Sequence, residues 1–323
     1  MKLTAEQEEQ IEKAASLIKD GQVVGLPTET VYGLAGDISN PASLELIFKT
    51  KKRPFFDPLI VHVHSTEQLK ELALTVPEIA EKLMKIFWPG PLTFILPKHP
   101  KLNNLITSGL ETVGVRMPNH PIALELLKRL DHPVAAPSAN MFGKTSPTQA
   151  SHVQKEFGDD VFVIDGGECQ VGVESTVIGF KKNKIVIYRP GAVTKEKLEE
   201  ALKLLEETTY KVIEDESPVA PGHLKHHYMP EIPLVIVDDF EFVGLDKPAL
   251  MKKLRISEWR PAELRLSDEP EIAARELYSQ LRELSSSRAN FIFVCYNPKH
   301  VSGLWSAIWN RIEKAATINL CQK

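Results

Sequence analysis

Three arginines at the ends of short apolar runs suggest an anion-binding site. Arg53 and Arg189 each stand directly before a proline, and Arg116 ends an apolar run that contains two valines. A guanidinium beside buried strands needs an anionic partner, which either the protein or a ligand can supply. Three such groups favour a ligand with several negative charges, such as a nucleotide together with a carboxylate.

A basic cluster surrounds the first of these arginines and comprises Lys49, Lys51, Lys52 and Arg53. Cations at the end of a helix complement its dipole, so the cluster also fits an ordinary solvated helix end. Prolines follow closely and stiffen the backbone near Arg53. This stiffening favours a functional role for the arginine.

The segment SANMFGKT, residues 138–145, resembles the end of a phosphate-binding P-loop, but Ser138 stands where that motif requires glycine. The segment lies between a predicted strand and a predicted helix. Small and hydroxyl residues at such a position suit phosphate binding. Hydrogen bonds that shape the loop explain Ser138 and Asn140 equally well, and Ser146 also fits a helix N-cap.

Other polar residues have structural readings of similar weight. His62 lies in a predicted buried strand, where a histidine is more often a satisfied core residue. Residues 28–30 fit a turn cap, and residues 174–176 fit an ordinary strand start. Three histidines lie between residues 223 and 227, without an acidic or cysteine companion at metal-ligand spacing, so we predict no protein-bound metal.

The elements that must position these residues alternate between strand and helix. Hydrophobic patterns and turn residues predict strands at 23–26, 59–63, 92–96, 113–116, 134–136, 161–164, 177–180 and 184–189. Capping boxes at Thr4 and Ser146 and an Asn-Pro pair at 40–41 begin three of the predicted helices. Alternation of this kind predicts a mixed α/β sheet covered by helices.

The chain divides after residue 207. A polar, proline-containing stretch follows and reads as a linker. Further strands at 234–237 and 291–295 and helices at 271–284 and 304–315 predict a second, smaller α/β unit. We therefore predict a domain at 1–207, a linker at 208–232 and a C-terminal domain at 233–323.

Composition narrows the class of protein. The 323 residues are 43% hydrophobic and carry a formal charge of -4, so no global basic field indicates nucleic-acid binding. The three cysteines are far apart in the sequence, which suits a reducing compartment. The sequence has neither an apolar leader nor a run long enough to span a membrane, so we expect a soluble, cytoplasmic protein.

Taken together, the motifs resemble the YrdC/Sua5 proteins, the L-threonylcarbamoyladenylate synthases, in their two-domain Sua5 form. They run in the family's order. The matching stretches are PTETVYGL (27–34), KKRP with DPLIVH (51–62), WPGPLTF (88–94), VGVRMPNHP (113–121), APSAN (136–140), SPT (146–148), IDGG with GVEST (164–176) and RPG (189–191).

The resemblance implies a fold and a reaction. The fold is a twisted mixed sheet with flanking helices and a concave basic surface, followed by a smaller, Rossmann-like α/β domain. The enzyme is a nucleotidyltransferase that converts L-threonine, bicarbonate or CO₂, and ATP with Mg²⁺ into L-threonylcarbamoyl-AMP and pyrophosphate. Partner proteins then transfer the threonylcarbamoyl group to adenosine 37 of tRNAs that read ANN codons, which makes weak RNA binding a further expectation.

The resemblance also assigns roles to individual residues. The implied threonine ligands are Thr30, His62, Arg116, Ser175 and the backbone at Ala136. The implied ATP ligands are Arg53, Asp57, Thr112, Ser138, Ser146, Arg189 and Lys225. The catalytic set implied by the family's KxR and SxN motifs is Lys51, Arg53, Ser138 and Asn140.

Two of these positions depart from the family's pattern. Asp57 stands where asparagine is common, and its extra charge near phosphates is unfavourable unless Mg²⁺ lies between them. Lys225 stands where some members have a tyrosine near the nucleotide. The linker itself is predicted to act as a lid. We therefore expect deletion of residues 208–323 to abolish or greatly weaken activity.

Three other functions remain open from the sequence. One is a regulatory role in which the C-terminal unit binds a partner. A concave basic surface could bind double-stranded RNA without any nucleotide chemistry. The same fold could also act on carbamoyl phosphate, although relatives of that kind are usually embedded in larger proteins with zinc-binding regions.

Overall fold

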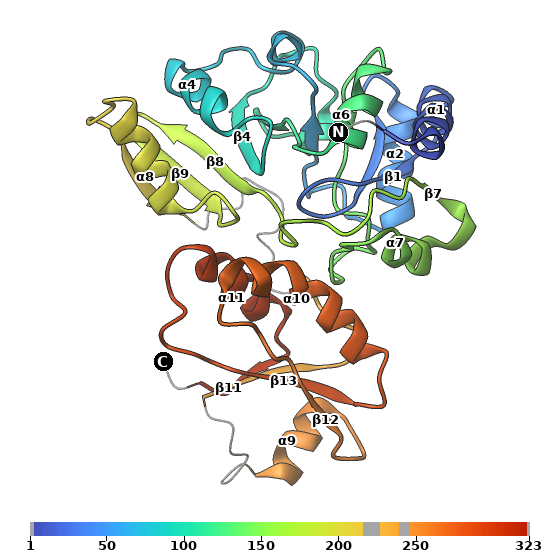
Figure 1. Cartoon of the computed structure of the whole chain (residues 1–323), viewed down its shortest axis with the longest axis vertical. Helices are drawn as coiled ribbons and strands as arrows, with labels where there is room; N and C mark the ends of the chain where they lie inside the picture. Colours follow the sequence, from blue (N-terminus) through green and yellow to red (C-terminus); the bar gives the residue numbers. More distant parts are fainter. Residues whose placement is uncertain (1–2, 216–226, 239–245, 322–323) are drawn as a thin grey trace.

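The computed structural model describes residues 3–215, 227–238 and 246–321, which form two α/β units (Figure 1). The N-terminal domain is built on a ten-stranded mixed sheet, and the C-terminal domain on a four-stranded one. A mixed α/β fold with a second, smaller domain was predicted, and the structure confirms it. The domain boundaries stay a prediction.

The large sheet holds ten strands. In spatial order they are β10 (Lys211–Glu214), β9 (Lys184–Arg189), β8 (Thr176–Lys181), β4 (Leu92–Pro97), β5 (Thr112–Arg116), β3 (Ile60–His62), β6 (Val134–Ala135), β2 (Gly33–Asp37), β1 (Val24–Leu26) and β7 (Phe162–Val163). Its helices are α1 (Ala5–Lys19), α2 (Pro41–Lys51), α3 (Leu69–Leu72), α4 (Glu78–Phe87), α5 (Asn104–Thr107), α6 (Pro121–Lys128), α7 (Ala150–Phe157) and α8 (Lys195–Leu204).

Local sequence explains how several helices begin. The Thr4 side chain accepts a hydrogen bond from the Gln7 backbone while the Gln7 side chain accepts one from the Thr4 backbone, so the predicted capping box starts α1. Asn40 caps α2, and Pro41 occupies its first turn. The apolar stripe of α1 then packs in the same buried cluster as strand β1 and helix α6.

Strand directions bring the predicted ligands to one edge of the sheet. β3 and β5 run parallel, and His62 pairs with Arg116 at their carboxyl ends. β4 runs antiparallel to β5 and parallel to β8, so the amino end of β8 lies at this same edge. β9 returns antiparallel to β8 and ends there at Arg189. Residues far apart in sequence therefore converge.

The structure differs from the sequence predictions in several places. Strand β2 was not predicted, and β10 lies inside the segment predicted as a linker, where it pairs with β9. The second capping box was wrong, because α7 begins at Ala150 after Gln149. The Ser146 hydroxyl instead donates a hydrogen bond to Glu174, 2.6 Å away.

The C-terminal domain is a parallel sheet with two long helices against one face. The strand order is β12 (Pro261–Glu263), β13 (Phe291–Cys295), β11 (Leu234–Val237) and β14 (Ile318–Asn319), with helices α9 (Lys247–Leu254), α10 (Pro270–Ser285) and α11 (Leu304–Ala315). Helices α10 and α11 lie between this sheet and the N-terminal domain (Figure 1).

The two domains share a hydrophobic cluster. Val31 and Val173 of the N-terminal domain are buried together with Tyr278 of α10 and Trp309 of α11. Each domain therefore covers apolar surface of the other. Among the described residues, none of the helices has the length and apolar character needed to cross a membrane.

Candidate active site

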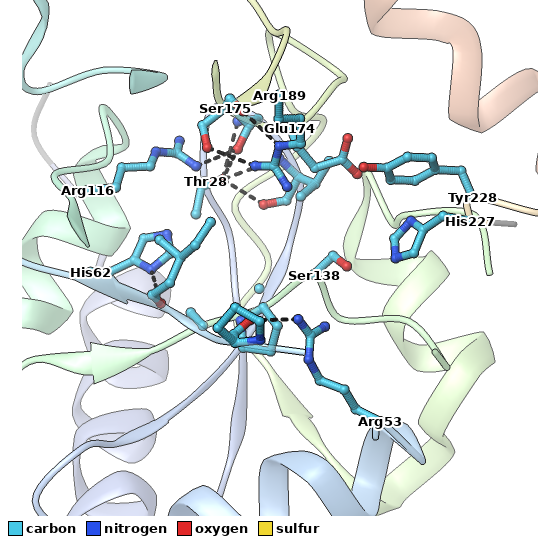
Figure 2. Close-up of a pocket in the computed structure, with 17 residues that line it drawn as sticks. Thr28, Arg53, His62, Arg116, Ser138, Glu174, Ser175, Arg189, His227 and Tyr228 are labelled. Atoms are coloured by element: carbon cyan, nitrogen blue, oxygen red, sulfur yellow. Dashed lines mark hydrogen bonds between the residues drawn. The ribbon is translucent and has the colours of Figure 1, made fainter. Parts of the chain in front are cut away.

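A cavity at the converging edge of the large sheet is lined by residues from several elements (Figure 2). Eight of the residues predicted from the sequence line it: Thr30, Arg53, His62, Arg116, Ala136, Ser138, Ser175 and Arg189. The structure therefore brings together all five predicted threonine ligands and three of the predicted ATP ligands.

Arg116, at the end of β5, already has an anionic partner within the protein. Its Nη2 lies 2.6 Å from Glu29 Oε2, with both side chains buried. Nη1 donates to the Thr30 hydroxyl at 2.9 Å, and Nε donates to the Gly90 carbonyl at 3.3 Å. These contacts fix the guanidinium at the cavity wall before any ligand binds.

His62 lies beside Arg116 and is uncharged at neutral pH. Burial, together with the nearby Arg116 charge, lowers the pKa of His62 to about 3. Its Nδ1 lies 3.3 Å from the Ile60 carbonyl, which can only accept, so Nδ1 carries the proton. Nε2 is therefore left as a hydrogen-bond acceptor.

Ser175 is held from two sides. Its hydroxyl lies 2.8 Å from the Thr93 hydroxyl, and Arg189 Nη2 donates to the same oxygen at 3.1 Å. Arg189 Nε also donates to the Ser175 carbonyl at 3.1 Å. Arg189 thus lines the cavity and positions Ser175 at the same time.

Arg53 follows the left-handed C-cap of α2 and turns back onto residues 57 and 58. Its Nε donates to the Asp57 carbonyl at 3.0 Å, and Nη2 donates to the Pro58 carbonyl at 2.8 Å. Nη2 also lies 2.9 Å from Asp57 Oδ2. Burial raises the pKa of Asp57 against the opposing effect of Arg53. The arginine thus counterbalances the extra acidic residue noted in the sequence.

Other predicted residues lie around the cavity without lining it. Lys51 is buried and donates to the carbonyls of Ser138 and Asn140, so it braces that loop. Burial, then repulsion from Arg53, lowers the pKa of Lys51. Ser146 is hydrogen-bonded to Glu174, as described above.

Two further predictions lie elsewhere. Thr112 begins β5 and Arg116 ends it, and a strand rises about 3.3 Å per residue, so Thr112 lies at the opposite end of the strand. Lys225 falls outside the described residues.

Sequence reasoning missed several residues of this site, including two carboxylates. Glu29 and Glu174 were read as parts of a turn and a strand start, while His227 and Tyr228 were considered only as part of a histidine-rich segment. Glu174, His227 and Tyr228 line the cavity, and Glu29 pairs with Arg116. The sequence did contain a signal for the two carboxylates. A buried arginine requires an anionic partner, and Glu29 and Glu174 stand within motifs that also contain predicted site residues.

Family models match both parts of the chain. The Sua5/yciO/yrdC model, described as "Telomere recombination", matches residues 16–191. A second model, described as "Threonylcarbamoyl-AMP synthase, C-terminal domain", matches residues 193–317.

Similar proteins cover nearly the whole chain. The threonylcarbamoyl-AMP synthase of Bacillus subtilis (strain 168) is 38% identical over 95% of this chain and 93% of its own. The protein of the same name from Pyrococcus abyssi is also 38% identical, over 96% and 95%. The crystal structure of P. abyssi Sua5 complexed with L-threonine superposes with a TM-score of 0.84 at 36% identity, covering 99% and 98% of the two chains. Fold, motifs and these matches agree, and the chain belongs to the two-domain Sua5/YrdC family of threonylcarbamoyl-AMP synthases.

Proposed function

We propose that this cavity binds L-threonine and ATP side by side and joins them, through a carbamate, into L-threonylcarbamoyladenylate with release of pyrophosphate. The observation that carries the proposal is that Arg53, Arg116 and Arg189 reach one cavity from three separate parts of the chain. Their spread matches two anionic substrates better than one.

The threonine half of the site is proposed to lie around Arg116. The arginine would bind the threonine carboxylate, and His62 Nε2 would accept a hydrogen bond from the amine. Thr30, Ser175 and the Ala136 backbone complete this part of the cavity. The related P. abyssi structure, which contains L-threonine, supports a threonine site in this fold.

The nucleotide half is proposed to lie around Arg53, Ser138 and Arg189, with Ser146 nearby. Lys51 contributes by holding the Ser138–Asn140 loop rather than by facing the cavity. The role of Thr112 rests on the family resemblance alone. The carboxylates of Glu29, Asp57 and Glu174 are each paired with an arginine and so do not form a site for a metal ion by themselves. We therefore propose that Mg²⁺ enters bound to the ATP phosphates.

The chemistry then needs little covalent help from the protein. The threonine amine loses a proton and attacks CO₂, or attacks bicarbonate with loss of water, to form a carbamate. The carbamate oxygen then attacks the α-phosphorus of ATP while pyrophosphate leaves. A carbamate is unstable in water, so the buried walls protect it. Positioning and cationic stabilisation of the phosphates supply most of the acceleration.

We propose that the product passes to a threonylcarbamoyl transferase that modifies adenosine 37 of tRNA, in keeping with the family. RNA binding by this chain itself would be weak. A steep fall of RNA affinity with salt, without ATP turnover, would instead favour the double-stranded RNA reading.

The direct test is pyrophosphate release by the purified protein, with and without L-threonine and bicarbonate. Release should require both. Arg116→Ala alone leaves Glu29 buried without its partner, so the informative variant is Arg116→Ala with Glu29→Gln. Loss of charged hydrogen bonds to the substrate should lower threonine-dependent release by about 100-fold.

Arg129→Ala is the matched control, because Arg129 forms salt bridges on the surface between α1 and α6. It should keep full activity. A folded protein that binds ATP but shows no dependence on threonine would contradict the substrate assignment.

A further inference from the structure

Arg311 belongs to α11 of the C-terminal domain, but its side chain is buried against the N-terminal domain. Its Nε donates to Glu174 Oε2 at 3.0 Å, and Nη2 reaches the Glu174 carbonyl at 3.5 Å. Its Nη1 donates to the Pro190 carbonyl at 2.5 Å. One guanidinium therefore bonds two separate segments of the other domain.

Both segments carry residues of the proposed site. Glu174 directly precedes Ser175, and Pro190 directly follows Arg189. Ser175 and Arg189 line the cavity and are hydrogen-bonded to each other. Figure 2 shows Glu174, Ser175 and Arg189 grouped along one wall of the cavity. Arg311 stands behind this wall and holds its two halves together.

Arg311 also balances a charge. Glu174 lines the cavity, and although burial alone would raise its pKa, Arg311, Arg189 and the Ser146 hydroxyl lower the pKa to about 2. Glu174 is therefore ionised at neutral pH. Tyr278 of α10 donates to the same carboxylate at 2.9 Å. Without Arg311, a buried negative charge would face the space proposed for ATP phosphates.

We propose that Arg311 is a positioning residue for the synthase reaction. It sets the geometry of Ser175 and Arg189 and cancels the charge of Glu174, so that the wall can accept a phosphate group. The C-terminal domain thus supports catalysis through an arginine that does not line the cavity. This inference rests on the function proposed above.

The alternative is that Arg311 only helps to hold the two domains together. Other residues at the interface make contacts that serve this purpose. Arg282 of α10 lies 3.4 Å from Glu156, and the hydroxyls of Thr148 and Ser279 are 2.9 Å apart. Arg275 donates to the Gln170 carbonyl at 3.1 Å. The shared apolar cluster adds further cohesion. Docking of the domains and positioning of the wall are therefore separable by mutation.

Three variants of the full chain separate geometry from charge. Arg311→Met removes both the hydrogen bonds and the charge. Arg311→Lys keeps the charge but lacks the planar fork needed to bond Glu174 and Pro190 together. The double variant Arg311→Met with Glu174→Gln also removes the carboxylate that would be left unpaired. It should therefore fold even if Arg311→Met alone does not.

The measurements are kcat and the KM for ATP from pyrophosphate release, and the Kd for ATP from equilibrium binding. Arg311→Met should lower kcat/KM by about 100-fold, in line with the loss of hydrogen bonds to a buried charge. Arg311→Lys and the double variant should recover ATP affinity, while their kcat stays low. Arg275→Met, which removes an exposed contact of the same interface, should match the wild type.

The outcomes are distinct. Folded Arg311 variants with wild-type kcat and ATP affinity would overturn the inference and leave Arg311 as an adhesive contact. A low kcat that Arg311→Lys fully restores would overturn the geometric part. Failure of the wild-type protein to release pyrophosphate with threonine would instead count against the proposed function, and ATP binding by the variants would still test the charge effect.

Discussion

At the scale of single residues, the cavity is electrostatically prepared before any substrate binds. Arg116 pairs with Glu29, Arg53 with Asp57, and Arg311 with Glu174, all with buried side chains. Arg189 lies beside these pairs and donates a hydrogen bond to the Ser175 carbonyl. The protein therefore holds these guanidinium groups in place before a carboxylate or phosphate group binds.

The pKa of His62 makes the stability of the protein sensitive to acid. In the unfolded chain the imidazole has a pKa of 6.5, whereas in the folded protein it is about 3. Below pH 6.5 the unfolded state therefore binds a proton that the folded state does not. The stability of the folded protein consequently decreases as the pH is lowered. Lowering the pH from 7.5 to 5.5 should therefore decrease the free energy of unfolding by about 1 kcal/mol through this residue.

Denaturant unfolding of His62→Gln at these two pH values checks this prediction. The variant should lose about 1 kcal/mol less than the wild type on acidification. His132→Gln is the control, because that side chain is exposed, and it should behave like the wild type. An unchanged pH dependence in His62→Gln would show that the imidazole titrates normally in the folded state.

At the scale of elements, the site depends on the close approach of two segments, the start of β8 and the end of β9. Gly191 lies where they meet. A Cβ atom at this position would come within 2.7 Å of the Glu174 carbonyl oxygen and 2.8 Å of the Ser175 carbonyl carbon. These are backbone atoms, so they cannot move aside as a side chain would.

Gly191→Ala should therefore force the two segments apart. Overpacking of this kind costs about 1–3 kcal/mol, and the displaced Ser175 and Arg189 should lower kcat/KM beyond the loss of folded protein. Thermal unfolding and pyrophosphate release measure the two effects.

Gly114→Ala serves as the comparison, because a Cβ there meets its nearest side-chain atoms at 3.4 Å and beyond, which is ordinary contact. It should be tolerated. Full activity in Gly191→Ala would mean that the approach of β8 and β9 is not required for catalysis.

At the scale of the whole molecule, neither domain is independent of the other. Val31 and Val173 of the N-terminal domain are buried in the cluster that contains Tyr278 and Trp309. His227 and Tyr228, which precede the C-terminal sheet in the sequence, line the cavity itself. The active site is therefore completed by residues beyond the large sheet.

A chain that ends at Asp215 keeps β10 on the sheet but loses these contacts. Its Glu174 would lose its contacts with Arg311 and Tyr278, and Val31 and Val173 would be exposed. The cavity would also lose His227 and Tyr228, so we expect threonine-dependent pyrophosphate release to fall by at least about 100-fold, the size of a loss of charged hydrogen bonds. Circular dichroism should still show folded α/β secondary structure, and thermal unfolding of the fragment should give a lower Tm. Full activity in this folded fragment would refute the dependence on the C-terminal domain.

Much of the site was predictable because its residues stand in short motifs at strand ends. Arg116, Arg189 and Ser138 were all identified from their place after an apolar run or before a proline. The prediction that Ser146 caps a helix was wrong for a physical reason. Its hydroxyl donates to the buried carboxylate of Glu174, and a hydrogen bond to a charged group is stronger than one to a backbone amide. A local pattern cannot reveal a competitor 28 residues away.

The amino-acid sequence by itself determined the alternation of strands and helices, the motif order that identifies the family, and most of the side chains at the cavity. These depend on local periodicity and on short-range backbone chemistry. The partners of the buried charges were settled by tertiary packing. Glu29 reaches Arg116 across the sheet edge, and Glu174 reaches Arg311 across the domain interface. Because desolvation makes an unpaired buried charge costly, the fold selects these pairs from residues that the sequence places far apart.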